Sequence, residues 1–334
     1  MAMKKRTKNI EPGFDPESDE DNRLDTVVGI EPPKSKHQAP VGELEFNCCD
    51  NNFIDCDDFT GETVRDEALF PSAGAVAFGA SGQVQNPRVD YLPTSTVNFE
   101  RVIGDDDRVR ILDTLDADRP WAKRICSLIA TTRTGERLRG TGWLAGKRLV
   151  MTTAHNLFVH ERAGWVKTVT VIPGRNGRSA PFETFTVRAP ELLITRGWED
   201  RKDLTADFGG IIIPKSYSQR HLGQTGFFSI RVFSDNDLVR ARVKIAGYPA
   251  FISPVGTQWW HGRRISPRIS PDALRYNIDT TKGQSGSPAF ITIGGQRYVA
   301  GIHNVDIGAF NQAVRINSEV LSVIRDWKRR SEQV

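Results

Sequence analysis

From about residue 102 onward, the sequence predicts an all-β fold, either a sandwich or a barrel, preceded by a largely irregular N-terminal segment. Short runs rich in β-branched and aromatic residues recur along this region, and clusters of Gly, Pro, Asn and Asp separate them, as in proteins built from many short strands. The composition changes at the same point. Residues 1–101 carry 10 Lys+Arg and 19 Asp+Glu, whereas residues 102–334 carry 35 and 22. The chain therefore divides into an acidic segment and a basic β region.

The acidic segment is predicted to form no fold of its own. Residues 1–45 are polar, charged and interrupted by proline, a composition that buries too little apolar surface to order a chain. Residues 46–101 show neither helical nor strand periodicity. We find no apolar h-region and no run of about 18 apolar residues, so we expect neither a secretory signal peptide nor a transmembrane helix.

The acidic segment also holds three of the four cysteines, Cys48, Cys49 and Cys56, in the stretch FNCCDNNFIDC. They could bind a metal ion or remain free thiols. Because the spacing lacks the two-residue gap of common zinc knuckles, free thiols are favoured and no metal is expected. The fourth, Cys126, is expected to be a small buried apolar residue on a strand.

The β region contains ten expected strands, in the segments RICSLIATT, LVMTTAH, KTVTVIP, ETFTVRAP, FGGIIIP, ARVKIAGYP, YNIDTT, SPAFITI, RYVAGIH and AVRI. The C-terminal end differs, because Asn317 or Ser318 can cap a helix there. The helix is predicted over residues 318–330, and its apolar face is formed at helical spacing by Val320, Leu321, Val323, Ile324 and Trp327. We expect this helix to pack on the β domain.

Three separated residues of the β region can together perform nucleophilic catalysis. His155 follows the strand LVMTTA, Asp207 precedes the strand FGGIII, and Ser285 lies in the motif KGQSGSPAF. A serine hydroxyl needs a base, an imidazole can take its proton, and a buried carboxylate fixes the imidazole. Gly283 would let its own N–H and that of Ser285 form an oxyanion hole. Asp203 is a rival for the acid, but no strand follows it directly, so we favour Asp207.

With these residues in place, the sequence resembles the chymotrypsin-type serine endopeptidases, and more closely the bacterial glutamyl endopeptidases of the staphylococcal and bacillary kind. The similarity runs from about Val102 to Trp327 and is carried by segments that include GTGWLAG, TTAHNL, ADFGGIII, YNIDTTKGQSGSP and GIHN. It implies two antiparallel β-barrels, over residues 102–215 and 216–334, with the triad between them. It also implies protein or peptide substrates, an acyl-enzyme and no cofactor.

The resemblance implies cleavage after Glu, and less readily after Asp. The family's specificity pocket corresponds to Thr280, His303 and the free amino group of Val102 as the mature N-terminus. These groups suit a carboxylate, which needs hydrogen bonds and positive charge when it leaves water.

Two departures from the family pattern leave a trypsin-like protease of other specificity as an alternative. Lys282 lies beside the oxyanion glycine, where relatives have glycine, and Asn304–Asp306 follow His303 where relatives have a nearby glycine. Val305 would narrow the substrate groove. Asp306, if it points inward, would repel Glu and favour Lys or Arg.

Because Arg101 precedes the mature start, the resemblance implies that residues 1–101 are an inhibitory pro-segment removed between Arg101 and Val102. A Glu-specific enzyme would not cut there itself, so an upstream Arg-specific protease is an expected partner. Cleavage at Glu100 with trimming is the alternative. The missing signal peptide favours an intracellular bacterial zymogen over secretion by another route.

A second class of function is a non-catalytic interaction protein that acts through residues 1–101. Nucleic-acid binding is not expected, because Lys and Arg are scattered apart from the clusters GRRISPRIS and DWKRR. No membrane partner is expected either.

Overall fold

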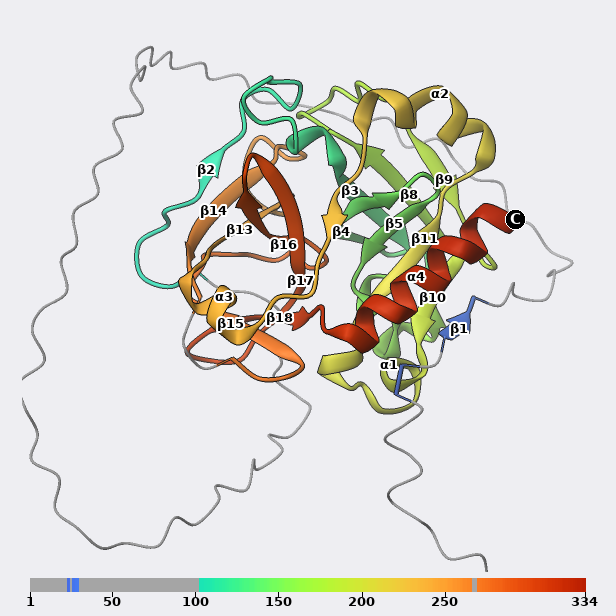
Figure 1. Ribbon diagram of the computed structural model, residues 1–334. Helices are drawn as coiled ribbons and strands as arrows, with labels where there is room; N and C mark the ends of the chain where they lie inside the picture. Colours follow the sequence, from blue (N-terminus) through green and yellow to red (C-terminus); the bar gives the residue numbers. More distant parts are fainter. Residues whose placement is uncertain (1–22, 25, 30–101, 266–268) are drawn as a thin grey trace, which may run out of the picture. The chain divides into compact units, whose positions relative to one another are not determined.

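The computed structural model describes residues 23–24, 26–29, 102–265 and 269–334, which belong to one compact unit. The all-β prediction is confirmed, because two antiparallel sheets of eight strands each make up most of this unit (Figure 1). No helix in these residues is long and apolar enough to cross a membrane. Cys48, Cys49, Cys56, Glu100 and Arg101 lie outside the described residues.

The first sheet has the strand order β1-β10-β11-β5-β4-β3-β8-β9 and is antiparallel throughout. Its strands are β1 (Thr26–Val28), β3 (Ile125–Thr131), β4 (Arg137–Gly146), β5 (Leu149–Thr152), β8 (Thr168–Pro173), β9 (Phe185–Val187), β10 (Leu192–Thr195) and β11 (Gly209–Ile212). A small hairpin, β6 (Phe158–Val159) and β7 (Gly164–Trp165), forms a separate sheet.

The second sheet has the order β15-β18-β17-β16-β13-β14-β2, and β12 pairs in parallel with β17. Its strands are β2 (Val109–Arg110), β12 (Ser229–Ile230), β13 (Arg242–Gly247), β14 (Trp259–Arg264), β15 (Ala273–Tyr276), β16 (Pro288–Ile293), β17 (Gln296–Asp306) and β18 (Asn311–Arg315). Residues 109–110, expected in the first barrel, therefore belong to the second sheet. Four α-helices complete the unit: α1 (Arg196–Arg201), α2 (Lys215–Thr225), α3 (Asp235–Arg240) and α4 (Ser318–Gln333).

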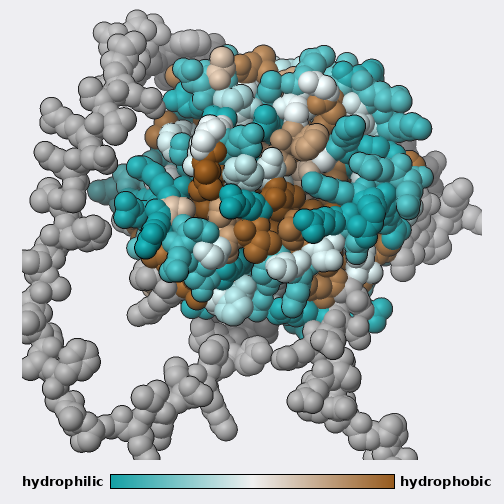
Figure 2. Space-filling view, in the orientation of Figure 1, coloured by the Kyte–Doolittle hydropathy of each residue, from teal (hydrophilic) through white to brown (hydrophobic). Residues whose placement is uncertain are grey.

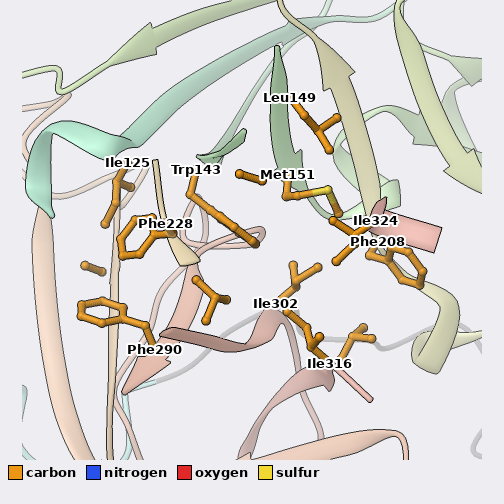
Figure 3. Close-up of a cluster of buried hydrophobic side chains, with 14 of the residues drawn as sticks. Ile125, Trp143, Leu149, Met151, Phe208, Phe228, Phe290, Ile302, Ile316 and Ile324 are labelled. Atoms are coloured by element: carbon orange, nitrogen blue, oxygen red, sulfur yellow. The ribbon is translucent and has the colours of Figure 1, made fainter. Parts of the chain in front are cut away.

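A continuous apolar cluster joins the two sheets. Trp143 and Met151 of the first sheet lie in one cluster with Phe290 and Ile302 of the second (Figure 3). Ile324 of α4 belongs to the same cluster. Because close-packed interiors resist displacement, this cluster fixes the sheets relative to each other and so fixes residues at their junction. Figure 2 shows that the outer face in this orientation is mostly hydrophilic, with hydrophobic side chains near its middle.

Helix α4 confirms the prediction for the C-terminus and extends it by three residues. The Asn317 side chain accepts a hydrogen bond from the Val320 N–H at 3.0 Å, so Asn317 is the N-cap. Val320, Ile324 and Trp327 are buried against the inter-sheet cluster. The helix therefore closes over both sheets through the face that the periodicity indicates.

Local structure departs from the predictions in several places. Residues 1–45 are predicted to be mostly disordered, and within them Thr26–Val28 form β1; a strand this short has no detectable period, and its partner β10 is distant in sequence. Only the first residue of YNIDTT lies in a strand, because the following residues form the turn that leads to Ser285. The predictions do not include the helices α1, α2 and α3, nor the strands β2, β4, β6, β7, β10, β12 and β14. Cys126 is buried on β3, as expected.

Candidate active site

His155 and Asp207 meet at the end of two paired strands. His155 lies in a 3-10 turn (Ala154–Asn156) after β5, and Asp207 lies two residues before the start of β11, which pairs with β5. The His155 Nδ1 lies 2.8 Å from Asp207 Oδ2, and the His155 backbone N–H donates to Oδ1 at 3.0 Å. The Asp207 side chain is only 1% exposed. Since the carboxylate accepts from Nδ1–H, Nε2 is the basic nitrogen of the neutral ring.

Asp203, the rival acid, serves the turn that presents Asp207. It caps the 3-10 turn Leu204–Ala206, where its carboxylate accepts from the Thr205 N–H at 2.8 Å and from the Thr205 hydroxyl at 2.7 Å. The Thr195 hydroxyl donates to the Ala206 carbonyl from the other side. The structure therefore gives the two aspartates different positions, and only Asp207 contacts the histidine ring through these bonds.

Ser285 is tied to both sheets through its backbone. Its carbonyl accepts from the Thr141 N–H of β4 at 2.9 Å and from the Asn156 side chain at 3.0 Å. Asn156 is the neighbour of His155, so this bond links the serine loop to the histidine turn. The next residue, Gly286, donates its N–H to the His303 carbonyl of β17 at 2.7 Å. Asn156 and Thr141 have no recognisable signal in the sequence, because their roles depend on partners more than 100 residues away.

The turn before Ser285 accepts only glycine at its predicted oxyanion position. Gly283 has φ of +100°, and a Cβ there would lie 2.6 Å from both the Tyr248 carbonyl oxygen and the Ala250 nitrogen. The Thr141 hydroxyl donates to the Gly283 carbonyl at 2.8 Å, and the Ala250 N–H donates to the Lys282 carbonyl at 2.7 Å. These bonds fix the peptide planes of the turn from outside, as a preorganised donor site requires.

Thr280 and His303, the two side chains of the predicted specificity pocket, are both fully buried. The Thr280 hydroxyl has no hydrogen-bond partner among the described residues. The His303 Nδ1 lies 3.0 Å from the Gln312 carbonyl oxygen and 2.8 Å from the Tyr276 hydroxyl. Burial lowers the pKa of His303 to about 3, although the bond to Gln312 acts in the opposite direction. His303 is therefore neutral near pH 7 and can offer a hydrogen bond, but no charge.

The start of the β region is anchored beside this pocket by a residue that the sequence analysis missed. Asp279, whose side chain is fully buried, accepts from the Ile103 N–H at 2.8 Å and from the Asp107 N–H at 3.1 Å. Asp279 adjoins Thr280 in the sequence, so these bonds hold Ile103, the neighbour of Val102, against the residue next to Thr280. Only the spacing to Thr280 could have suggested this role.

Arg108 connects the same N-terminal stretch to the serine loop. Its side chain is 2% exposed and donates to the Thr281 hydroxyl at 2.6 Å and to Gln284 Oε1 at 2.8 Å. Asp106 pairs with the guanidinium at 2.6 Å, and this pairing lowers the pKa of the Asp106 carboxyl. Gln284 lies between Gly283 and Ser285. The bond from Arg108 to Gln284 therefore connects residues 103–108 to the predicted oxyanion turn.

Asp107, His261 and Asp279 offer ligand atoms close enough to hold a metal ion. Their contacts serve another purpose, however. Backbone N–H groups occupy the Asp279 carboxylate, the Asp279 N–H donates to His261 Nδ1 at 3.0 Å, and the Arg263 guanidinium pairs with Asp107. The group is thus part of the anchor for residues 103–108.

The departures from the family pattern lie as follows. Lys282 is exposed and Val305 is buried in β17. Asp306 Oδ1 accepts from the Gly308 N–H at 2.7 Å, which places this carboxylate on the turn between β17 and β18. Asn304 donates to the Leu204 carbonyl at 2.8 Å and so supports the turn before Asp207. The Asp306 carboxylate is therefore bonded within its own turn, and the bond involves neither Thr280 nor His303.

No model of a known protein family matches the chain. A glutamyl endopeptidase of Bacillus licheniformis is 31% identical over 241 residues, which are 69% of this chain and 70% of that relative. A Bacillus subtilis protein named an extracellular metalloprotease is 28% identical over 234 residues, which are 70% and 71% of the two chains. A solved structure of a Glu endopeptidase in complex with MPD matches with a TM-score of 0.58 and 24% identity, over 68% of this chain and 99% of that one. This last likeness confirms the fold class that the resemblance implied.

Proposed function

Because the chain belongs to the glutamyl endopeptidase family and is a serine endopeptidase, we propose that it cleaves peptide bonds after Glu, and less readily after Asp, once the bond between Arg101 and Val102 has been cut. In this proposal, Ser285 attacks the substrate carbonyl while His155 Nε2 takes the hydroxyl proton. The N–H groups of Gly283 and Ser285 stabilise the oxyanion, and His155 returns the proton to the leaving amine. Water then attacks the acyl-enzyme while His155 takes its proton, and His155 returns this proton to Ser285 as the acid product leaves.

The specificity proposal depends on one observation: the Asp279 carboxylate, next to Thr280 in the chain, accepts a hydrogen bond from the Ile103 N–H at the amino end of the β region. Thr280 is fully buried, and so is His303 of β17. A glutamate side chain in this pocket would meet the hydroxyl of Thr280, the imidazole of His303 and the ammonium of Val102. A buried carboxylate needs such partners, whereas a Lys or Arg side chain would meet like charge.

A peptide library tests this specificity. On protein processed between Arg101 and Val102, we expect cleavage after Glu to be strongly enriched, with Asp second, because only these side chains match the pocket. Mass spectrometry of the products identifies the cleaved bonds, and a Ser285→Ala chain treated in the same way serves as the control. Enrichment of cleavage after Lys or Arg would instead support the alternative specificity.

Activation supplies a second prediction. In the uncut chain, residue 102 is an amide without charge, so the pocket lacks its cation. We expect an Arg101→Gln chain, which an Arg-specific protease cannot cut at this bond, to remain inactive under conditions that activate the unaltered chain. N-terminal sequencing of active protein should begin at Val102. Full activity with residues 1–101 still attached would contradict the proposal.

The hydrogen bonds of Arg108 to Thr281 and Gln284 predict that this residue affects kcat, although it does not contact the substrate. Arg108→Ala removes a charged donor from the buried Gln284 side chain and the ion-pair partner of the exposed Asp106 carboxylate, and losing such a donor at a buried group typically costs about 1–3 kcal/mol. We expect kcat to fall about tenfold to a hundredfold, since each 1.4 kcal/mol is a factor of ten. The exposed Arg110→Ala is the matched control. A change in KM alone would argue against a role in ordering the oxyanion turn.

A further inference from the structure

A short strand from the acidic segment is part of the protease's first sheet. β1 pairs antiparallel with β10, with Thr26 opposite Thr195 and Val28 opposite Leu193 (Figure 1). The Gly29 N–H continues the ladder to the Leu192 carbonyl at 2.9 Å. β1 is thereby the edge strand of the first sheet. Its neighbour β10 pairs on the other side with β11, which begins two residues after Asp207.

The surface of the protease is shaped to receive this strand closely. The Gly197 N–H donates to the Arg23 carbonyl at 2.8 Å, and a Cβ on Gly197 would lie 2.5 Å from that oxygen. At the other end, a Cβ on Gly29 would lie 2.7 Å from the Ala189 Cβ. A glycine is therefore needed at each end of the strand: Gly197 of the protease at one end and Gly29 of the N-terminal segment at the other.

The Arg23 side chain joins three parts of the protease. Its guanidinium donates to Asp272 at 3.1 Å, beside the second sheet, and to Glu319 of α4 at 3.3 Å. It also donates to the Thr205 hydroxyl at 3.3 Å, in the turn that presents Asp207. One arginine of the acidic segment thus spans the first sheet, the second sheet and the C-terminal helix.

Apolar contacts reinforce the strand. Leu24 and Val28 pack against the cluster that joins the two sheets, and Val27 packs against the core of the first sheet. The Trp327 indole N–H, at the buried face of α4, donates to the Thr26 hydroxyl at 2.6 Å. The strand therefore completes both cores and satisfies a tryptophan that would otherwise lose this acceptor.

We propose that residues 23–29 are a permanent strand of the enzyme, so that the fragment 1–101 stays bound after cleavage and the active species has two chains. The proposed cleavage between Arg101 and Val102 determines only when the active species comes to consist of two chains. None of the hydrogen bonds described above involves that bond, since their partners all lie between Leu192 and Trp327. Main-chain pairing at a sheet edge is an established way for one chain to hold a peptide of another. Without β1, the edge of β10 would present unpaired backbone groups.

The test uses the full chain with Ser285→Ala and a recognition sequence for a site-specific protease inserted after Gly82. After this chain is cut by the added protease, we expect the N-terminal fragment to co-elute with the protease domain in size-exclusion chromatography. Native mass spectrometry should show one copy of each. Because neither the nucleophile nor the Arg101–Val102 bond is used, the result does not depend on the proposed activity or activation. Elution of the fragment by itself would overturn the proposal.

Variants distinguish strand pairing from charge attraction between an acidic and a basic part. We expect Gly29→Val to release the fragment, whereas Arg65→Ala, which removes one arginine from the acidic segment outside the strand, should not. High salt should leave the unaltered complex intact, because it screens charges but not a backbone ladder. Release by salt, together with co-elution of Gly29→Val, would show that charge alone holds the fragment and would overturn the strand proposal.

Discussion

Replacing Asp207 by asparagine should lower kcat about ten-thousandfold, the order of magnitude known for this change in serine proteases. Both carboxylate oxygens accept from His155, one from the ring and one from the backbone. An asparagine can keep the backbone bond only by turning its NH₂ group toward Nδ1. The ring proton must then move to Nε2, and an imidazole protonated there cannot take the proton of Ser285.

Asp203→Asn is the matched control for this experiment. Its carboxamide oxygen can still accept from the Thr205 N–H and cap the same turn, so kcat should change by no more than a few fold. Both variants are processed with an added protease before kcat is measured on a peptide, and circular dichroism checks their folding. Equal losses in the two variants would mean that the turn, and not the Asp207–His155 bond, carries the effect.

The local parts of the fold and of the candidate site could be predicted from the sequence. Helix α4 has a cap and an apolar face within 16 residues, and the segments around His155, Asp207 and Ser285 each combine a strand with a characteristic neighbour. Such features depend on short stretches of chain, so their pattern is visible in one sequence.

The parts that could not be predicted are those that two distant segments make together. Arg108 and Gln284 are 176 positions apart, and so are Ile103 and Asp279. In the sequence, Arg108 is one more charged residue in DDDRVR, and only the fold shows that its guanidinium is buried against the serine loop. β1 was missed for the same reason, because its three residues become a strand only on the edge of β10.

The preference for Glu should vanish as pH rises through the pKa of the Val102 amino group. His303 cannot supply the positive charge, because burial lowers its pKa to about 3 and it stays neutral throughout the working range. An α-amino group ordinarily has a pKa of about 7.7–8.0. Its charged form exists below that pKa, so the preference is present at low pH and is lost as pH increases.

The ratio of kcat/KM for a Glu substrate to that for the matched Gln substrate isolates this effect. Both substrates use the same catalytic groups, so the effect of pH on the chemical steps cancels in the ratio. We expect a constant ratio from about pH 5 to 7 and a fall approaching tenfold per pH unit above about pH 8. In the neutral His303 ring, Nδ1 either donates to the Gln312 carbonyl or accepts from the Tyr276 hydroxyl, and only the second arrangement leaves the proton on Nε2 for a substrate carboxylate. Tyr276→Phe removes that hydroxyl and so favours the first arrangement. This variant should lower the ratio at every pH without moving its midpoint. A midpoint between pH 3 and 6 in the unaltered enzyme would instead assign the charge to His303, and a ratio independent of pH up to 9 would exclude both groups.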